Sequence, residues 1–217
     1  MRWTRLERLA PLTGIVAVAF WVLAVVVLEA IGDTPDDSAP ATEIRAYFDE
    51  EQGTIFAGSV LFGVGTAFFL WFLGSLRAAL REAEGPPGRL SAIAFGAGVG
   101  MQTLLLAFIA PTLAGAAALD YLDRDLSPEA AEALFVIGDG FLIMSFLLAL
   151  PFLAATGIAV ARTRVLPAWL GWITLALGIV MVTPVSWIFF FLGLPLWTLL
   201  VSVLLYLRGR APAAAAG

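Results

Sequence analysis

The chain has 217 residues, of which 61% are hydrophobic and only 13% charged, and its formal net charge at pH 7 is −5. Soluble domains carry about 25% charged residues, so this composition excludes an ordinary water-soluble fold and predicts an all-α, polytopic membrane bundle. The absence of Cys and His removes disulfides, thiol nucleophiles and the commonest metal ligand, so we expect no cofactor, and the negative charge argues against a nucleic-acid partner.

Six apolar segments follow one another along the chain. A helix needs about 20 apolar residues to cross the roughly 30 Å hydrocarbon layer, and we treat each segment as one span of a single transmembrane domain covering residues 1–210. The predicted spans are 12–31, 54–76, 90–118, 132–161, 168–183 and 186–207. The first is too long for a secretory signal and has no small-x-small cleavage site after it, so we expect it to be retained. The Ala-rich tail 211–217 is expected to be disordered.

Local signals mark where several helices begin or bend. Ser127, Pro128 and Glu129 are typical of a helix N-terminus, because the hydroxyl caps free N–H groups and proline suits the first turn. Pro111 and Pro151 lie inside apolar segments and predict kinks, since each ring removes a backbone donor. These signals place helix starts and bends without any tertiary information.

The connections carry their own patterns. Residues 85–88, Gly-Pro-Pro-Gly, predict a tight break between the second and third spans. A further turn is expected near 183–186, because the apolar stretch from 168 to 207 is too long for one span. Between the first two spans, the apolar Ile44, Tyr47 and Phe48 recur at helical spacing, which predicts a short amphipathic helix over 42–51, lying on the outer face of the membrane.

Every cation is an arginine, and the twelve arginines are unevenly distributed. Short loops rich in Arg stay cytoplasmic, so their positions predict orientation. Ten arginines lie at the two ends or in two short connections: Arg2, Arg5, Arg8, Arg77, Arg81, Arg89, Arg162, Arg164, Arg208 and Arg210. Only Arg45 and Arg124 lie on the opposite side, together with twelve of the seventeen acidic residues. The pattern predicts a bacterial cytoplasmic-membrane protein with both termini in the cytoplasm.

Asp139 is the one acidic residue well inside an apolar segment, roughly 8 Å along the helix axis from the start of the apolar stretch. Carboxylates at such depth usually face a bundle interior or a wet cavity, so Asp139 is a candidate for an intramembrane polar site. Candidate partners are Ser59, Thr66, Gln102, Ser145 and Thr156. The competing interpretation is that Asp139 hydrates near the outer surface, and that its candidate partners make ordinary interhelical hydrogen bonds.

Four glycines are predicted to mediate helix packing. Gly96 and Gly100 form a small-xxx-small pair, and Gly138 and Gly140 flank Asp139. Glycines at such positions let another backbone approach closely. A nucleotide-binding interpretation of the 96–100 run fails, because no strand precedes it and it lies in apolar sequence.

Two acidic clusters remain, Asp33/Asp36/Asp37 and Asp120/Asp123/Asp125. Neither has the spacing, the glycine or the terminal glutamate of an EF-hand loop. We interpret both as solvated turns and predict no metal site.

Three sequence motifs stand out: Leu70–Arg81, Gly138–Gly140 and Leu166–Ile173. Taken together they describe a helix end, an Arg-bearing loop and a Pro-Trp re-entry into the membrane. Together they resemble a group of uncharacterised multipass membrane proteins from actinobacteria that share a domain of unknown function. The resemblance covers most of the chain after about Pro40. It implies a six-span helical fold and supplies no activity and no site residues.

The sequence carries no catalytic or transport signature, and three functions are weighed. The leading one is an accessory or structural component of the inner membrane without catalysis, whose partners are the lipid bilayer and a homo-oligomer or another membrane protein. The alternative is a small transporter or channel that uses Asp139. The third is an intramembrane lipid-modifying enzyme, which would need carboxylate or Ser chemistry, and no suitably paired acids appear within the spans.

Overall fold

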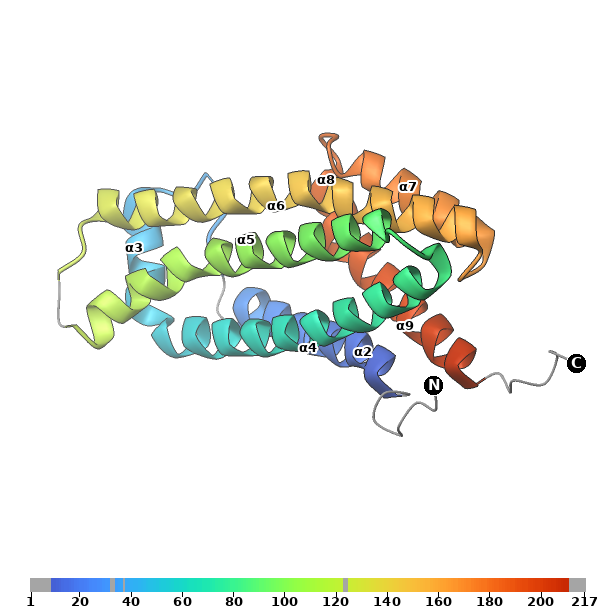
Figure 1. Cartoon of the computed structure of the whole chain (residues 1–217). Coiled ribbons are helices and arrows are strands. Elements are labelled where there is room, and N and C mark those ends of the chain that lie inside the picture. The colour runs from blue at the N-terminus through green and yellow to red at the C-terminus, as the bar shows by residue number, and fades with distance from the viewer. Residues whose placement is uncertain (1–8, 32–33, 37, 123–124, 211–217) are drawn as a thin grey trace, which may run out of the picture. The chain divides into compact units, whose positions relative to one another are not determined.

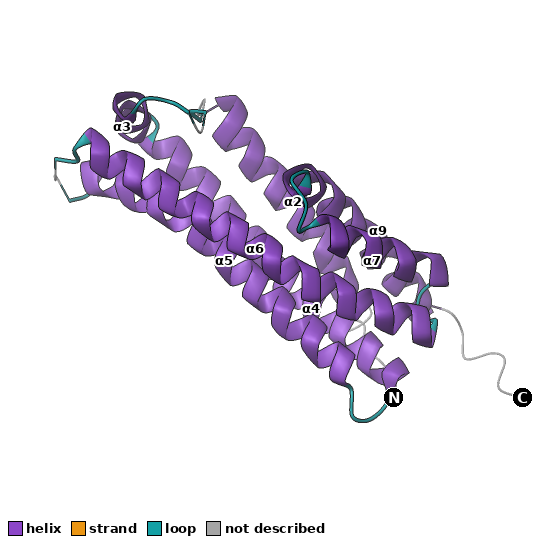
Figure 2. Ribbon diagram, turned by 90° about the horizontal axis from the view of Figure 1, so that it is seen from above, coloured by secondary structure: helices purple, strands orange, loops and turns teal. Residues whose placement is uncertain are grey.

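The computed structural model describes residues 9–31, 34–36, 38–122 and 125–210, and these residues are mostly helical, with no strand among them (Figures 1 and 2). Several residues used in the sequence analysis lie outside the described ranges: Arg2, Arg5, Arg8, Asp33, Asp37, Asp123, Arg124 and the tail 211–217.

The helical elements of the described residues are η1 (Ala10–Leu12), α2 (Thr13–Val25), η2 (Val26–Ile31), α3 (Ala41–Glu50), α4 (Gln52–Glu84), α5 (Arg89–Asp120), α6 (Pro128–Thr163), α7 (Ala168–Val180), α8 (Ser186–Ile188), η3 (Phe189–Gly193) and α9 (Leu194–Arg210). Among them, five are long and apolar enough to cross a membrane: Ala10–Glu29, α4, α5, α6 and Ser186–Gly209. Pro111 and Pro151, where we expect kinks, lie inside α5 and α6.

The chain divides into two compact units. Unit 1 consists of Met1–Val18, Ala67–Met101 and Phe146–Gly217, and unit 2 consists of Ala19–Thr66 and Gln102–Ser145. The three longest helices, α4, α5 and α6, therefore contribute residues to both units.

The core of unit 1 is aromatic. The ring of Trp197 on α9 meets Phe72 of α4 and Phe152 of α6 edge-on, with centroids 6.3 Å and 5.5 Å away. Such pairs add about 0.5–1.5 kcal/mol beyond the burial of their area. The indole N–H of Trp197 donates to the Thr174 hydroxyl of α7 at 2.8 Å. Four helices of unit 1 therefore meet around one tryptophan whose polar atom is satisfied.

Helices α6 and α7 of unit 1 approach each other through glycine backbone. A Cβ at Gly157 would lie 2.7 Å from the carbonyl oxygen of Gly171, and one at Gly171 would lie 2.7 Å from the backbone nitrogen of Ala161. Real Cβ atoms do not approach backbone so closely. Lipid tails are as apolar as leucine, so close backbone packing of this kind is what holds membrane helices together.

The core of unit 2 includes the predicted amphipathic helix, and α3 confirms that a helix forms there. The expectation that it lies on the membrane face is incomplete, because its apolar side is buried inside the protein. Ile44, Tyr47 and Phe48 pack in one cluster with Ile55 of α4, Ala116 of α5 and Ala131 of α6. The Nε of Arg45 donates to the Leu126 carbonyl at 2.8 Å, and its guanidinium lies 3.5 Å from Asp125. Polar contacts therefore tie α3 to the segment before α6.

Two helix starts show how local sequence fixes element boundaries. The predicted N-terminus of α6 is confirmed, because the Ser127 hydroxyl accepts from the Ala130 N–H at 3.3 Å and Pro128 is the first helical residue. At α5, the carboxylate of Glu84 accepts from the N–H groups of Leu90 and Ser91 at 2.9 Å and 3.0 Å. Burial raises the Glu84 pKa, but these hydrogen bonds outweigh it and hold the pKa below its ordinary value.

The C-terminal part of unit 1 is a helical hairpin whose turn lies between Val180 and Ser186, which confirms the turn expected near 183–186. Within this turn, the N–H groups of Met181, Thr183 and Ser186 all donate to nearby carbonyls of the same segment. The wide helical turn η3 ends just before Pro195, whose ring has no N–H to give to the preceding turn.

Candidate functional site

Asp139 lies on α6 in unit 2, and its side chain is partly exposed. It is engaged in an interaction within the protein. Its neighbour Gly138 is buried against α5, where a Cβ would come within 2.8 Å of the Phe108 carbonyl oxygen. The carboxylate is thus carried by a stretch of helix that backbone packing holds firmly in place.

Gln102 on α5 is a polar residue buried in unit 2, and it is only 1% exposed. Its Oε1 accepts from the Thr66 hydroxyl of α4 at 3.3 Å. Its Nε2 has no hydrogen-bond partner in the part of the chain that the structure describes. The Asp139 carboxylate therefore does not hydrogen-bond to Gln102.

Antiparallel packing explains this separation. Within unit 2, the close contact of Gly138 with the Phe108 carbonyl gives the register of α6 against α5. Gln102 lies six residues before Phe108 on α5, or about 9 Å along the helix axis, whereas Asp139 is adjacent to Gly138.

The remaining hydroxyl candidates are mostly satisfied by their own helices. Ser145 is fully buried and donates to the Leu142 carbonyl at 2.6 Å, and Thr156 donates to the Phe152 carbonyl at 2.7 Å. The Ser59 hydroxyl on α4 has no hydrogen-bond partner among the described residues. Ser59 and Thr66 are seven residues apart and therefore share one face of α4.

The four packing glycines behave differently from one another. A Cβ at Gly100 would lie 2.8 Å from the Leu148 side chain, and Gly138 has the backbone contact described above. A Cβ at Gly96 or Gly140 would meet no atom within 4 Å, so this geometry gives neither residue a packing role. In the 96–100 run the close contact is made instead by Gly98, whose Cβ would lie 3.0 Å from Leu73.

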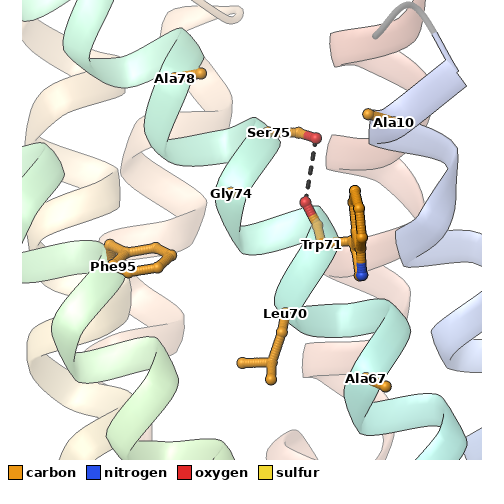
Figure 3. Close-up of a pocket in the computed structure, with 8 residues that line it drawn as sticks. All are labelled: Ala10, Ala67, Leu70, Trp71, Gly74, Ser75, Ala78 and Phe95. Atoms are coloured by element: carbon orange, nitrogen blue, oxygen red, sulfur yellow. Dashed lines mark hydrogen bonds between the residues drawn. The ribbon is translucent and has the colours of Figure 1, made fainter. Parts of the chain in front are cut away.

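A lateral groove of about 510 Å³ lies in unit 1, away from all the residues considered so far (Figure 3). One face of α4 forms most of it, with contributions from the N-terminal helix and α5. Its lining residues are Ala10, Ala67, Leu70, Trp71, Gly74, Ser75, Ala78 and Phe95. The sequence pattern did not predict this groove, because the groove exists only where three helices meet.

A second, smaller cavity of about 140 Å³ lies in unit 2 between the first turns of α4 and the last turns of α5. Gln52, Phe56, Asp120 and Tyr121 are among its lining residues. Asp139 lines neither cavity.

Acidic side chains in the described ranges do not form a metal-binding cluster, since no group of three or more His, Cys, Asp or Glu there has suitable geometry. Asp36, Asp120 and Asp125 are exposed. Asp125 lies 3.5 Å from the Arg45 guanidinium. This carboxylate therefore serves in a salt bridge at this position.

No protein-family model, no curated protein and no solved structure matches this chain.

Proposed function

We propose that this chain is an integral protein of a bacterial cytoplasmic membrane, that it crosses the bilayer six times with both termini in the cytoplasm, and that it serves as an accessory or structural membrane component. The observation that carries the membrane location is the outward exposure of large apolar side chains on its long helices. On α6, for example, Ile143 is 56% exposed and Leu147 is 48% exposed. Water would not tolerate such a surface, whereas lipid would solvate it.

The count of six includes the hairpin of α7 with α8, η3 and α9. Helix α7 has 13 residues and rises about 20 Å, which is less than the roughly 30 Å hydrocarbon layer. The turn from Met181 to Val185 extends it further. The N–H groups of Met181, Val182 and Thr183 bond within the segment, which lowers the cost of placing this turn near the outer boundary.

Fractionation of cells that express the chain tests the membrane location. We expect the protein to stay in the membrane pellet after extraction at alkaline pH in carbonate and to be released only by detergent. Its release by carbonate, as a monodisperse species in water, would overturn the proposal.

A small transporter or channel is the second candidate, and the buried polar groups of unit 2 favour it. Gln102 keeps an unpartnered amide donor where desolvation is costly, and Asp139 lies on the neighbouring helix. Purified protein in proteoliposomes would be assayed for proton or cation flux. This candidate requires a flux that Asp139→Asn abolishes while the variant remains folded, and an unchanged flux in that variant would rule out Asp139 as the responsive group.

We also propose that the chain is related to the actinobacterial membrane proteins of unknown function that it resembles. This relationship rests on the sequence motifs Leu70–Arg81, Gly138–Gly140 and Leu166–Ile173 alone.

A further inference from the structure

The lateral groove of unit 1 has a floor of small residues. Ala67, Gly74 and Ala78 lie on one face of α4 at spacings of seven and four residues, and all three are exposed. A Cβ at Gly74 would meet no atom within 4 Å. This part of α4 is therefore uncovered by the protein itself, and a chain of methylene groups would fit along it.

Two aromatic side chains form the walls. Figure 3 shows Trp71 on the side of α4 that faces the segment carrying Ala10, and Phe95 of α5 on the other side. Trp71 is 70% exposed, so its indole stands out from the protein surface. The Ser75 hydroxyl donates to the Trp71 carbonyl at 3.2 Å and is thereby satisfied within α4. The groove thus offers an apolar surface.

A positive charge is held at the edge of this apolar surface. The guanidinium of Arg77 lies 4.8 Å from the centroid of the Phe95 ring, which itself lines the groove. A cation–π contact does not use up the N–H donors of a guanidinium, which can still hydrogen-bond to an anion. Arg77 makes no salt bridge within the described residues, and no acidic side chain lines the groove.

We propose that the groove binds one anionic phospholipid of the cytoplasmic leaflet. An acyl chain lies along the small-residue floor between Trp71 and Phe95, and the phosphate group pairs with Arg77. A volume of about 510 Å³ falls within the range of roughly 300–1,000 Å³ that is usual for ligand pockets. Basic residues beside a cleft between membrane helices, at the cytoplasmic side, suit anionic headgroups. The inference rests on the proposed membrane location.

A second copy of the chain fits this face less well. A symmetric dimer through the α4 groove would bring both Arg77 side chains into one interface, where the groove lining supplies no acidic side chain to pair with them. A phospholipid supplies both the apolar chain and the negative charge that the groove lacks.

The experiment measures lipid binding to purified protein in neutral detergent by native mass spectrometry. The probes are phosphatidylglycerol and phosphatidylcholine with identical acyl chains, so that only the headgroup charge differs. We expect the wild type to bind one phosphatidylglycerol in preference to phosphatidylcholine. Arg77→Gln should reduce this preference about fivefold, the factor for about 1 kcal/mol per arginine near anionic lipid. Arg162→Gln, an exposed arginine at the end of α6, is the matched control and should retain it.

The floor is tested with two leucine substitutions on the same helix. Gly74→Leu fills the groove and should abolish binding of the lipid. Gly63→Leu adds the same side chain to α4 outside the groove, again with no atom within 4 Å of the new Cβ, and should bind like the wild type. If Gly74→Leu fails to fold, Ala78→Leu takes its place.

Equal affinity for the two lipids in the wild type would overturn the proposal, as would full retention of phosphatidylglycerol by both groove-filling variants. A change from dimer to monomer in Gly74→Leu with unaltered lipid binding would identify the groove as a protein interface instead. Carbonate extraction of the wild type distinguishes a failure of the proposed membrane location from a failure of the proposed lipid site. Release from the membrane refutes the membrane location, whereas retention without lipid preference refutes only the lipid site.

Discussion

Two glycines that flank Asp139 give a matched test of the packing in unit 2. Gly138→Ala would place a Cβ 2.8 Å from the backbone carbonyl oxygen of Phe108, whereas Gly140→Ala would place one where no atom lies within 4 Å. The carbonyl belongs to helix α5 and cannot turn aside as a flexible side chain can. One of the two helices must therefore shift.

Overpacking of this kind costs about 1–3 kcal/mol, a factor of roughly 5 to 150 in the equilibrium between folded and unfolded protein. Gly140→Ala meets no such obstacle and should leave the stability unchanged or raise it slightly, because alanine restricts the unfolded chain.

Reversible unfolding in mixed micelles, followed by helical circular dichroism as the fraction of denaturing detergent rises, would measure the difference between the two variants. The two substitutions sit two residues apart and change the composition identically, so general effects of added methyl groups cancel. Equal stability of Gly138→Ala and Gly140→Ala would refute the packing of α6 against α5 described here.

Two further substitutions test single polar contacts. Thr174→Val leaves the buried indole N–H of Trp197 without its acceptor and should lower the free energy of unfolding by about 1 kcal/mol. In the Trp197→Phe background, which has no indole N–H, the same Thr174→Val substitution should cost less. An equal cost in both backgrounds would mean that the 2.8 Å hydrogen bond contributes nothing. Glu84→Ala removes the acceptor for two N–H groups of α5 and should cost about 1 kcal/mol at neutral pH. Because the Glu84 pKa is lowered in the folded protein, this contribution is complete above the ordinary value of 4.5 and disappears as the pH falls through the lowered value. Thermal unfolding of both proteins between neutral pH and about pH 3 should show the curves converging in acid, and a constant difference would contradict the assignment.

Sequence alone predicted the features that depend on local pattern. The cap of α6 at Ser127, the short helix α3 and the turn after Val180 all follow from a few neighbouring residues, and the structure contains each of them. The sequence pattern did not single out Glu84. Its role at the start of α5 needs the turn through Gly85 and Gly88, both with positive φ, which brings the carboxylate back to the helix end.

Which side of a helix faces the protein could not be predicted. In water an apolar stripe marks the core, but in a membrane lipid-facing and core-facing positions are equally apolar. Gly96 and Gly98 illustrate the difficulty, because only the tertiary packing makes Gly98 touch Leu73 and leaves Gly96 uncovered. Gln102 and Thr66 were recognised separately as polar residues, and their pairing also required the packing of α4 against α5.

Orientation of α6 across the membrane is the most direct test of the account. Its 36 residues rise about 54 Å, and Glu132 and Arg162, which are both exposed, lie about 45 Å apart along the axis, as far as a bilayer is thick with its headgroups. The chain has no cysteine, so Glu132→Cys and Arg162→Cys each introduce a single labelling site. A membrane-impermeant maleimide should label Glu132→Cys from outside intact spheroplasts and Arg162→Cys only in inverted vesicles. Labelling of both from the same side would contradict the account.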